Sequence, residues 1–167
     1  MKQDKDFSCS AASLATLLQA FYGQTTTEEA LLTAMDKGDL RASFEDMARV
    51  LPQFGFKGIG YAASYEQLTK LKIPVVVYLK HRKDDHFSVL RGISHDVVWL
   101  ADPSLGNRKY SRAQFLAMWQ TRDNDLLKGK ILAVLPANAS VQSSSDFFTT
   151  QPQLVTQRAL PQRFVLP

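Results

Sequence analysis

Residues 86–102 read His-Phe-Ser-Val-Leu-Arg-Gly-Ile-Ser-His-Asp-Val-Val-Trp-Leu-Ala-Asp, and they contain two apolar runs separated by a short polar stretch. The runs, residues 86–93 and 97–101, are rich in β-branched and large apolar side chains, which is typical of strands. The polar residues 94–96 between them are few enough for a hairpin turn. This stretch therefore predicts two neighbouring antiparallel strands around which the rest of a sheet can form.

Further strands and two helices are predicted on either side of this hairpin. The strands are expected at residues 56–61, 73–79 and 130–135. Ser64 with Gln67 has the spacing of a capping box and predicts a brief helix, and Ser111 caps a helix predicted over residues 112–119. Strands thus dominate the second half of the chain.

The first third of the chain is predicted to be helical. Apolar residues recur at helical spacing over residues 8–22, Gly23 follows as a stop signal, and Cys9 is expected to open this helix. Two more helices are predicted from capping pairs, which are Thr26 with Glu29 and Ser43 with Asp46. Because helices come first and strands later, we expect an α+β fold, with the N-terminal helices packed against one side of a mainly antiparallel sheet.

The length of 167 residues is typical of one domain with one core. After Pro136 the composition changes to Ala, Ser, Gln, Thr and Pro without a clear period. We therefore expect a domain over residues 1–136 and a tail over residues 137–167. The tail keeps apolar side chains at Phe147 and Phe148, so we expect it to dock on the domain, on a partner or on another copy of the chain.

Charge and hydropathy exclude several classes of protein. The net charge is +4 and the isoelectric point about 9.2, but the basic residues are scattered, so no nucleic-acid partner is expected. The longest apolar run, residues 73–79, is too short to cross a membrane. The N-terminus carries no apolar signal segment, but export stays open because such a segment can be removed. A single cysteine excludes an intrachain disulfide.

Cys9 is the first candidate for chemistry. A thiol at the N-terminus of a helix faces free N–H groups and the positive end of the macrodipole, which lower its pKa and favour the nucleophilic thiolate. The ordinary alternative is that a single cysteine is a small buried apolar residue.

Three histidines are candidates for the base that deprotonates Cys9. His81 lies among charged residues that predict a solvated loop, and His95 lies in the predicted turn. His86 begins an apolar strand, which would hold its ring in place at the rim of the sheet. A strand-edge histidine bonded to a backbone carbonyl is the alternative reading of His86.

Two further residues complete a candidate site. The hairpin brings Asp102, at the end of its second strand, near the imidazole of His86, where a carboxylate fixes the tautomer and favours the imidazolium. An Asp-Pro pair also commonly begins a turn. Gln3, six positions before Cys9, can donate to an oxyanion alongside the cysteine's backbone N–H, although a glutamine near a terminus is usually solvated surface.

Over residues 3–136 the chain resembles the C39 peptidases, papain-like proteases that form the N-terminal domains of bacteriocin exporters and cut leader peptides after a double glycine. The resemblance rests on Gln3 spaced before Cys9, the helix of residues 11–18, and segments 86–93 and 102–106. It implies that Cys9 is the nucleophile, His86 the general base and acid, Asp102 the orienting group and Gln3 the oxyanion donor, without a metal or cofactor.

The chain departs from that pattern in two ways. Ser10 replaces the family's usual glycine, where a side chain is expected either to crowd the substrate or to add a hydroxyl at the helix start. The chain also lacks the exporters' membrane helices and their phosphate-binding G-x-x-x-x-G-K-[ST] loop. It looks more like the stand-alone C39 proteins of Gram-negative bacteria, including those encoded beside functional-amyloid secretion systems, which share the Asp-Phe-Ser-Cys run of residues 6–9.

The resemblance implies a periplasmic cysteine endopeptidase whose substrate is a peptide or protein of a secretion system, with leader cleavage after Gly-Gly as one form. The alternative is a peptide-binding module that assists secretion without cutting, which Ser10 favours. Acyl transfer uses the same three groups and is not distinguished from hydrolysis by the sequence.

Overall fold

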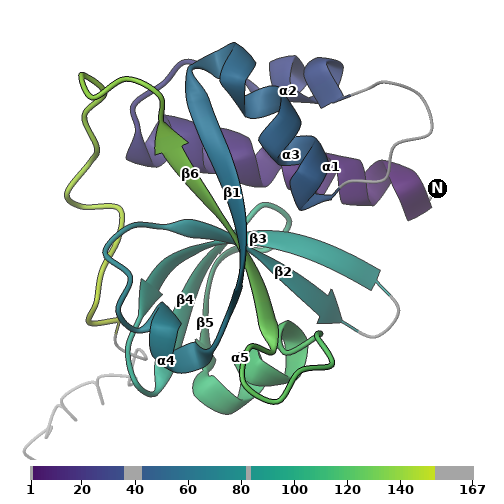
Figure 1. Ribbon diagram of the computed structural model, residues 1–167, viewed down its shortest axis with the longest axis vertical. Helices are drawn as coiled ribbons and strands as arrows, with labels where there is room; N and C mark the ends of the chain where they lie inside the picture. The colour runs from purple at the N-terminus through teal and green to yellow at the C-terminus, as the bar shows by residue number, and fades with distance from the viewer. Residues whose placement is uncertain (1, 36–42, 82–83, 153–167) are drawn as a thin grey trace, which may run out of the picture.

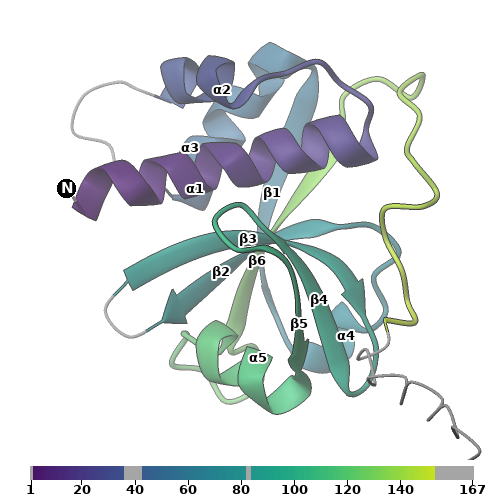
Figure 2. The same cartoon turned by 180° about the vertical axis from the view of Figure 1, so that it is seen from behind.

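The computed structural model describes residues 2–35, 43–81 and 84–152, with side chains from residue 8 onward. Its N-terminal third is helical. The helices are α1 (Lys2–Thr16), α2 (Glu28–Met35) and α3 (Phe44–Val50), and two short turns, η1 (Leu17–Phe21) and η2 (Leu51–Phe54), extend α1 and α3. Figures 1 and 2 show α1, α2 and α3 gathered on one side of the sheet.

The first helix confirms the prediction for residues 8–22 but begins earlier. Ala11, Leu14 and Leu18 are fully buried at helical spacing, and Gly23 ends the helical run with a φ of 63°, a conformation that glycine adopts without strain. The prediction that Cys9 opens the helix is wrong, because α1 starts at Lys2. Polar residues extend a nucleated helix at little cost without adding to its apolar period, so the true start leaves no signal.

Three of the four predicted helix caps are confirmed. Each is a serine whose hydroxyl accepts from the backbone N–H three residues later, and these are Ser43, Ser64 and Ser111. The fourth prediction, Thr26, is wrong by one position. The hydroxyl of Thr27 accepts from the N–H of Ala30 at 3.1 Å, just before α2.

The sheet has six strands in the order β1-β6-β2-β3-β4-β5, and each described pairing between neighbours is antiparallel. The strands are β1 (Phe56–Ala63), β2 (Val75–His81), β3 (Asp84–Ile93), β4 (Val97–Asp102), β5 (Gly106–Ser111) and β6 (Gly129–Pro136). The predicted hairpin corresponds to β3 and β4. Strand β5 was not predicted, because its polar sequence has no apolar alternation; it is an edge strand held by pairing with β4.

The two faces of the sheet carry separate cores. The N-terminal helices cover one face, as predicted, and bury it around Phe87, Val89 and Leu132. The two later helices, α4 (Tyr65–Leu68) and α5 (Arg112–Trp119), were predicted without being assigned to a face, and they cover the other face. Both lie on the side of the sheet opposite α1 in Figure 1. The helices are therefore divided between two faces, since Phe115 and Trp119 of α5 need a partner surface of their own.

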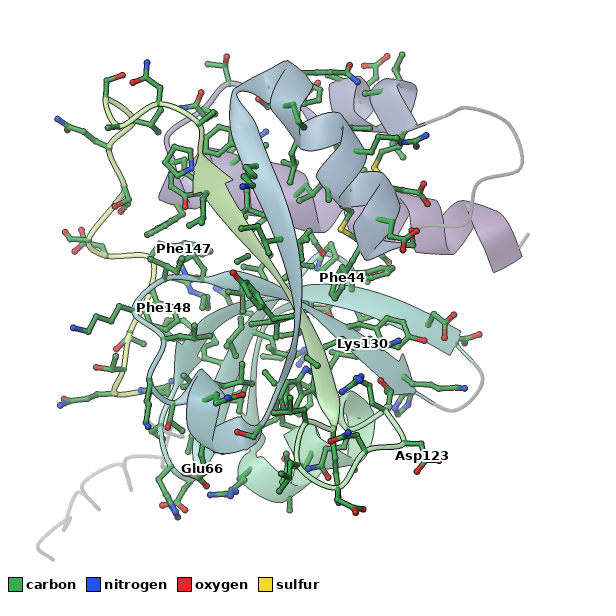
Figure 3. All side chains as sticks on the ribbon, viewed as in Figure 1. Phe44, Glu66, Asp123, Lys130, Phe147 and Phe148 are labelled. Carbon is green, nitrogen blue, oxygen red and sulfur yellow. The ribbon has the colours of Figure 1, made fainter. Side chains whose placement is uncertain are left out.

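The segment after β6 runs along the side of the sheet (Figure 2). Phe147 is buried in the core beneath the N-terminal helices, and Phe148 packs on the opposite core. Figure 3 labels both rings on this segment. Residues 153–167, with the remaining apolar part of the tail, lie outside the described residues. The boundary at residue 136 and association through the tail stay predictions.

Candidate active site

Three elements bring the predicted site residues together. Cys9 lies on α1, which packs against β3, while His86 lies near the start of β3 and Asp102 is the last residue of β4. The β3–β4 register pairs Val89 with Ala101, which places the start of β3 beside the end of β4. Residues far apart in sequence therefore meet, because helix α1 packs against the hairpin formed by β3 and β4.

The imidazole of His86 is bonded to a buried carboxylate. Its Nε2 lies 2.5 Å from Oδ2 of Asp102, whose side chain is 3% exposed. The other oxygen, Oδ1, accepts the backbone N–H of Ser104 at 2.8 Å and of Leu105 at 2.9 Å. Burial raises the pKa of Asp102, but the bonds from His86, Leu105 and Ser104 outweigh it and hold that pKa below its ordinary value.

His86 is set up to carry a proton at neutral pH. The hydrogen bond to Asp102, followed by the bond to Cys9, raises the pKa of His86 to about 10 against the opposing effect of burial. Because Nε2 faces Asp102, Nδ1 is the ring nitrogen left for the thiol. The side chain is 22% exposed, so the ring stays within reach of solvent while its orientation is fixed.

The thiol of Cys9 is shifted in the complementary direction. Its hydrogen bond with His86 lowers the pKa of Cys9, burial opposes this, and contact with the hydroxyl of Ser104 lowers it further. The expected source of activation, the start of a helix, is replaced by this imidazole, because Cys9 lies inside α1. A thiolate beside an imidazolium oriented by a carboxylate is the arrangement that attacks carbonyl carbon.

The other two histidines lie elsewhere. His81 is exposed at the end of β2. His95 is exposed in the β3–β4 turn, where its Nδ1 lies 3.0 Å from Oδ1 of Asp96 and its Nε2 lies 3.3 Å from Arg112. Only His86 is placed beside Cys9 among the histidines, all of which are described.

Gln3 and Ser10 belong to the same helix as Cys9. The backbone of Gln3 belongs to α1, but its side chain lies outside the described residues, so its role as an oxyanion donor stays a prediction. Ser10 is 0% exposed. Its side chain therefore points into the protein, and neither of the expected effects, a clash with substrate or a hydroxyl at the helix start, fits that position.

Ser104 is a neighbour of the thiol to which the sequence assigned no role. Its Oγ lies 3.6 Å from Sγ of Cys9. Its position two residues after Asp102 is a signal for a turn held by the aspartate, but the approach to α1 appears only in three dimensions. In the described part of the chain no group of three or more His, Cys, Asp and Glu side chains could hold a metal ion.

The sequence matches a known family. The sequence model of the Peptidase C39 family matches residues 1–122, and the chain therefore belongs to that family. It is 39% identical over 126 residues to the probable functional amyloid protease FapD of Pseudomonas fluorescens and 36% identical to that of Pseudomonas aeruginosa. Each match covers 71% of this chain and 56% of the relative, so the matched part spans about half the length of those proteins.

Solved structures confirm the fold. The peptidase domain of Streptococcus ComA, a bi-functional ABC transporter, has a TM-score of 0.64 at 19% identity, over 77% of this chain and 91% of that domain. A double glycine motif protease from an AMS/PCAT transporter, in complex with its leader peptide, has a TM-score of 0.64 at 22% identity, over 81% and 89%. The predicted α+β peptidase fold is therefore confirmed. No helix among the described residues is long and apolar enough to span a membrane.

Proposed function

We propose that this protein is a cysteine endopeptidase in which Cys9 is the nucleophile, His86 the general acid and base, and Asp102 the group that orients His86. The observation that carries the proposal is the continuous chain of contacts from the thiol through the imidazole to the buried carboxylate. Membership of the C39 family and the name of the FapD relatives support it.

The first half of the reaction makes a thioester. The thiolate of Cys9 attacks the carbonyl carbon of the scissile bond, and the negative charge moves to the carbonyl oxygen. As the C–N bond breaks, the proton on Nδ1 of His86 passes to the leaving amine. Gln3 is proposed to donate to the oxyanion, on the support of its place before Cys9 in the family's pattern.

The second half releases the product. Neutral His86 takes a proton from water, the hydroxide attacks the thioester carbonyl, and the C–S bond breaks to restore the thiolate beside the imidazolium. Asp102 holds the ring throughout, because its Oδ1 is itself fixed by two backbone N–H groups. The same thioester passed to an amine would give acyl transfer, so the products must be identified chemically.

The substrate class is proposed from the relatives. The matched proteins are named functional amyloid proteases, and a structural neighbour holds a leader peptide in a double glycine motif protease. We infer that a peptide of a secreted or fibre-forming protein is cut here, with a Gly-Gly leader as the first candidate. The proposal includes a periplasmic location, the compartment that an exported fibre component of a Gram-negative bacterium crosses, and a role in biofilm formation.

The alternative is a peptide-binding module that does not cut. The feature that favoured it was Ser10, and the burial of that side chain removes the argument that it blocks the substrate. Cys9 and His86 shift each other's pKa in the directions that nucleophilic catalysis requires, and binding alone does not require such a pair. Hydrolysis is therefore the function that the geometry supports best.

The test is cleavage of a synthetic peptide carrying a Gly-Gly site, and of purified fibre subunits, followed by mass spectrometry. We expect the wild-type protein to release two fragments whose masses sum to the substrate plus water, and Cys9→Ala to release none. Equal cleavage by both proteins would reject Cys9 as the nucleophile. Binding without cleavage at every concentration would reject hydrolysis in favour of the binding module.

A further inference from the structure

Ser104 contacts both ends of the candidate site with different atoms. Its side-chain Oγ lies 3.6 Å from Sγ of Cys9, and its backbone N donates to Oδ1 of Asp102 at 2.8 Å. A contact with sulfur at this distance is within hydrogen-bond range, since sulfur is larger than oxygen. We propose that Ser104 stabilises the thiolate of Cys9 through its hydroxyl and, through its backbone, ties that thiolate to the carboxylate that orients His86.

The direction of the hydroxyl bond depends on the charge of the sulfur. A neutral thiol can donate to Oγ or accept from it, whereas a thiolate can only accept. Ionisation of Cys9 therefore turns the contact into a charge-assisted bond donated by Ser104, which favours the ionised form. The lowered pKa of Cys9, to which this contact contributes, agrees with that direction.

The hydroxyl is held in place by the strands on either side of it. Asp102 and Gly106 are directly paired at the end of the β4–β5 ladder, so residues 103–105 form the tight connection between the two strands. Gly106 has a φ of 74°, a left-handed conformation that closes this connection. Two N–H groups of the connection, those of Ser104 and Leu105, bind the carboxylate of Asp102. Ser104 thus approaches Cys9 from a fixed turn.

Two variants separate the hydroxyl from the rest of the turn. Ser104→Ala removes Oγ but keeps the backbone N–H that binds Asp102, so the turn should persist. Ser104→Thr restores a hydroxyl on the same Cβ. The matched control is Ser8→Ala, because Ser8 is next to Cys9 in sequence but its hydroxyl binds Glu28 at 3.1 Å.

The measurement is the rate at which iodoacetamide alkylates Cys9 as a function of pH, with folding checked by circular dichroism. On the acidic side of the midpoint we expect Ser104→Ala to react about three- to tenfold more slowly than wild type, the range of one net hydrogen bond. At high pH, where the thiol is ionised in both proteins, this deficit should disappear. Ser104→Thr and Ser8→Ala should follow the wild-type profile.

A Ser104→Ala profile that superimposes on the wild-type profile would overturn the proposal. So would a Ser104→Thr profile that matches Ser104→Ala, because the hydroxyl would then not be the cause. The inference rests on the proposed function, but alkylation needs no peptide substrate. A wild-type protein that cuts nothing would reject the peptidase and still leave the effect of Ser104 measurable.

Discussion

The two ends of β3 are held in different ways. Near the N-terminal end, the ring of His86 is bonded to Asp102 and keeps part of its surface exposed. Near the C-terminal end, the pairing of β3 with β2 stops at Leu90. There the backbone of residues 91–93 is bonded to Thr149 instead, with Thr149 N donating to Arg91 O at 3.0 Å and Ile93 N donating to Thr149 O at 3.2 Å.

The side chain of Arg91 strengthens that second attachment. Its guanidinium lies 4.1 Å from the ring centre of Trp99 and 4.5 Å from that of Phe147, and its Nε donates to the carbonyl of Phe147 at 3.2 Å. At this end the polar groups satisfy one another and anchor the tail. At the other end they shift each other's pKa. We call the end of β3 at His86 the reactive end and the end at Arg91 the structural end. Mutations at the reactive end should change activity, and mutations at the structural end should change stability.

The largest effect is expected at the reactive end, from His86→Ala. Without the imidazole the proton transfers are lost, so cleavage should fall by about 10²–10⁴-fold. The bond that lowers the pKa of Cys9 most is also lost, so alkylation of Cys9 at pH 7 should slow. His95→Ala, which changes an exposed histidine away from the site, is the control and should keep wild-type cleavage. Equal cleavage by the two variants would contradict the assignment of His86.

The wild-type pH profile follows from the same two groups. The pKa of His86 is raised to about 10, so the imidazolium persists through neutral pH and activity should fall as the pH rises through about 10. The pKa of Cys9 is lowered from 9.0, so the thiolate also persists as the pH falls below that value. The acidic limb of kcat/KM should therefore lie below the ordinary pKa of a thiol. An acidic limb centred at the ordinary thiol pKa would contradict the coupling.

The reactive end was the more predictable of the two. A short turn between two apolar runs is enough to place His86 near Asp102, because antiparallel pairing follows from local sequence. The approach of Ser104 to Cys9 was not predictable, since it depends on how α1 packs against the sheet. No local pattern relates residues that are 95 positions apart.

At the structural end, the sequence predicted that the tail docks but not where it docks. The apolar rings of Phe147 and Phe148 indicated that the tail docks, but the surfaces they cover are formed by helices and strands elsewhere in the chain. The polar strand β5 was missed for a related reason, because its pairing with β4 holds it in the sheet and its own sequence has no strand period. The position of the tail and the strand conformation of β5 are both determined by tertiary contacts and not by local propensity.

A smaller effect, on stability alone, is expected from Phe147→Ala. The ring is 8% exposed and packs in the core beneath the N-terminal helices, so its loss should lower the free energy of unfolding by about 3 kcal/mol. Urea denaturation measures this change, and cleavage by the folded variant should stay near the wild-type rate. Phe148→Ala is the matched control and should cost less, because that ring is only partly buried. A variant as stable as wild type would show that the tail does not anchor this end.

The smallest effect is expected from Gly92→Ala, which tests how closely the tail approaches β3. A Cβ on residue 92 would lie 2.8 Å from Cγ2 of Thr149 and 3.2 Å from its carbonyl oxygen, so the tail must shift, at a cost of about 1–2 kcal/mol in unfolding free energy. Thr149→Ser removes that methyl group and keeps the hydroxyl, so it should recover part of the loss in the double variant. Gly60→Ala is the matched control, because the nearest atom to its new Cβ would be 4.0 Å away. If Gly92→Ala costs no more than Gly60→Ala, the contact between Thr149 and β3 is too loose to define a structural end, and the contrast between the two ends of the strand fails.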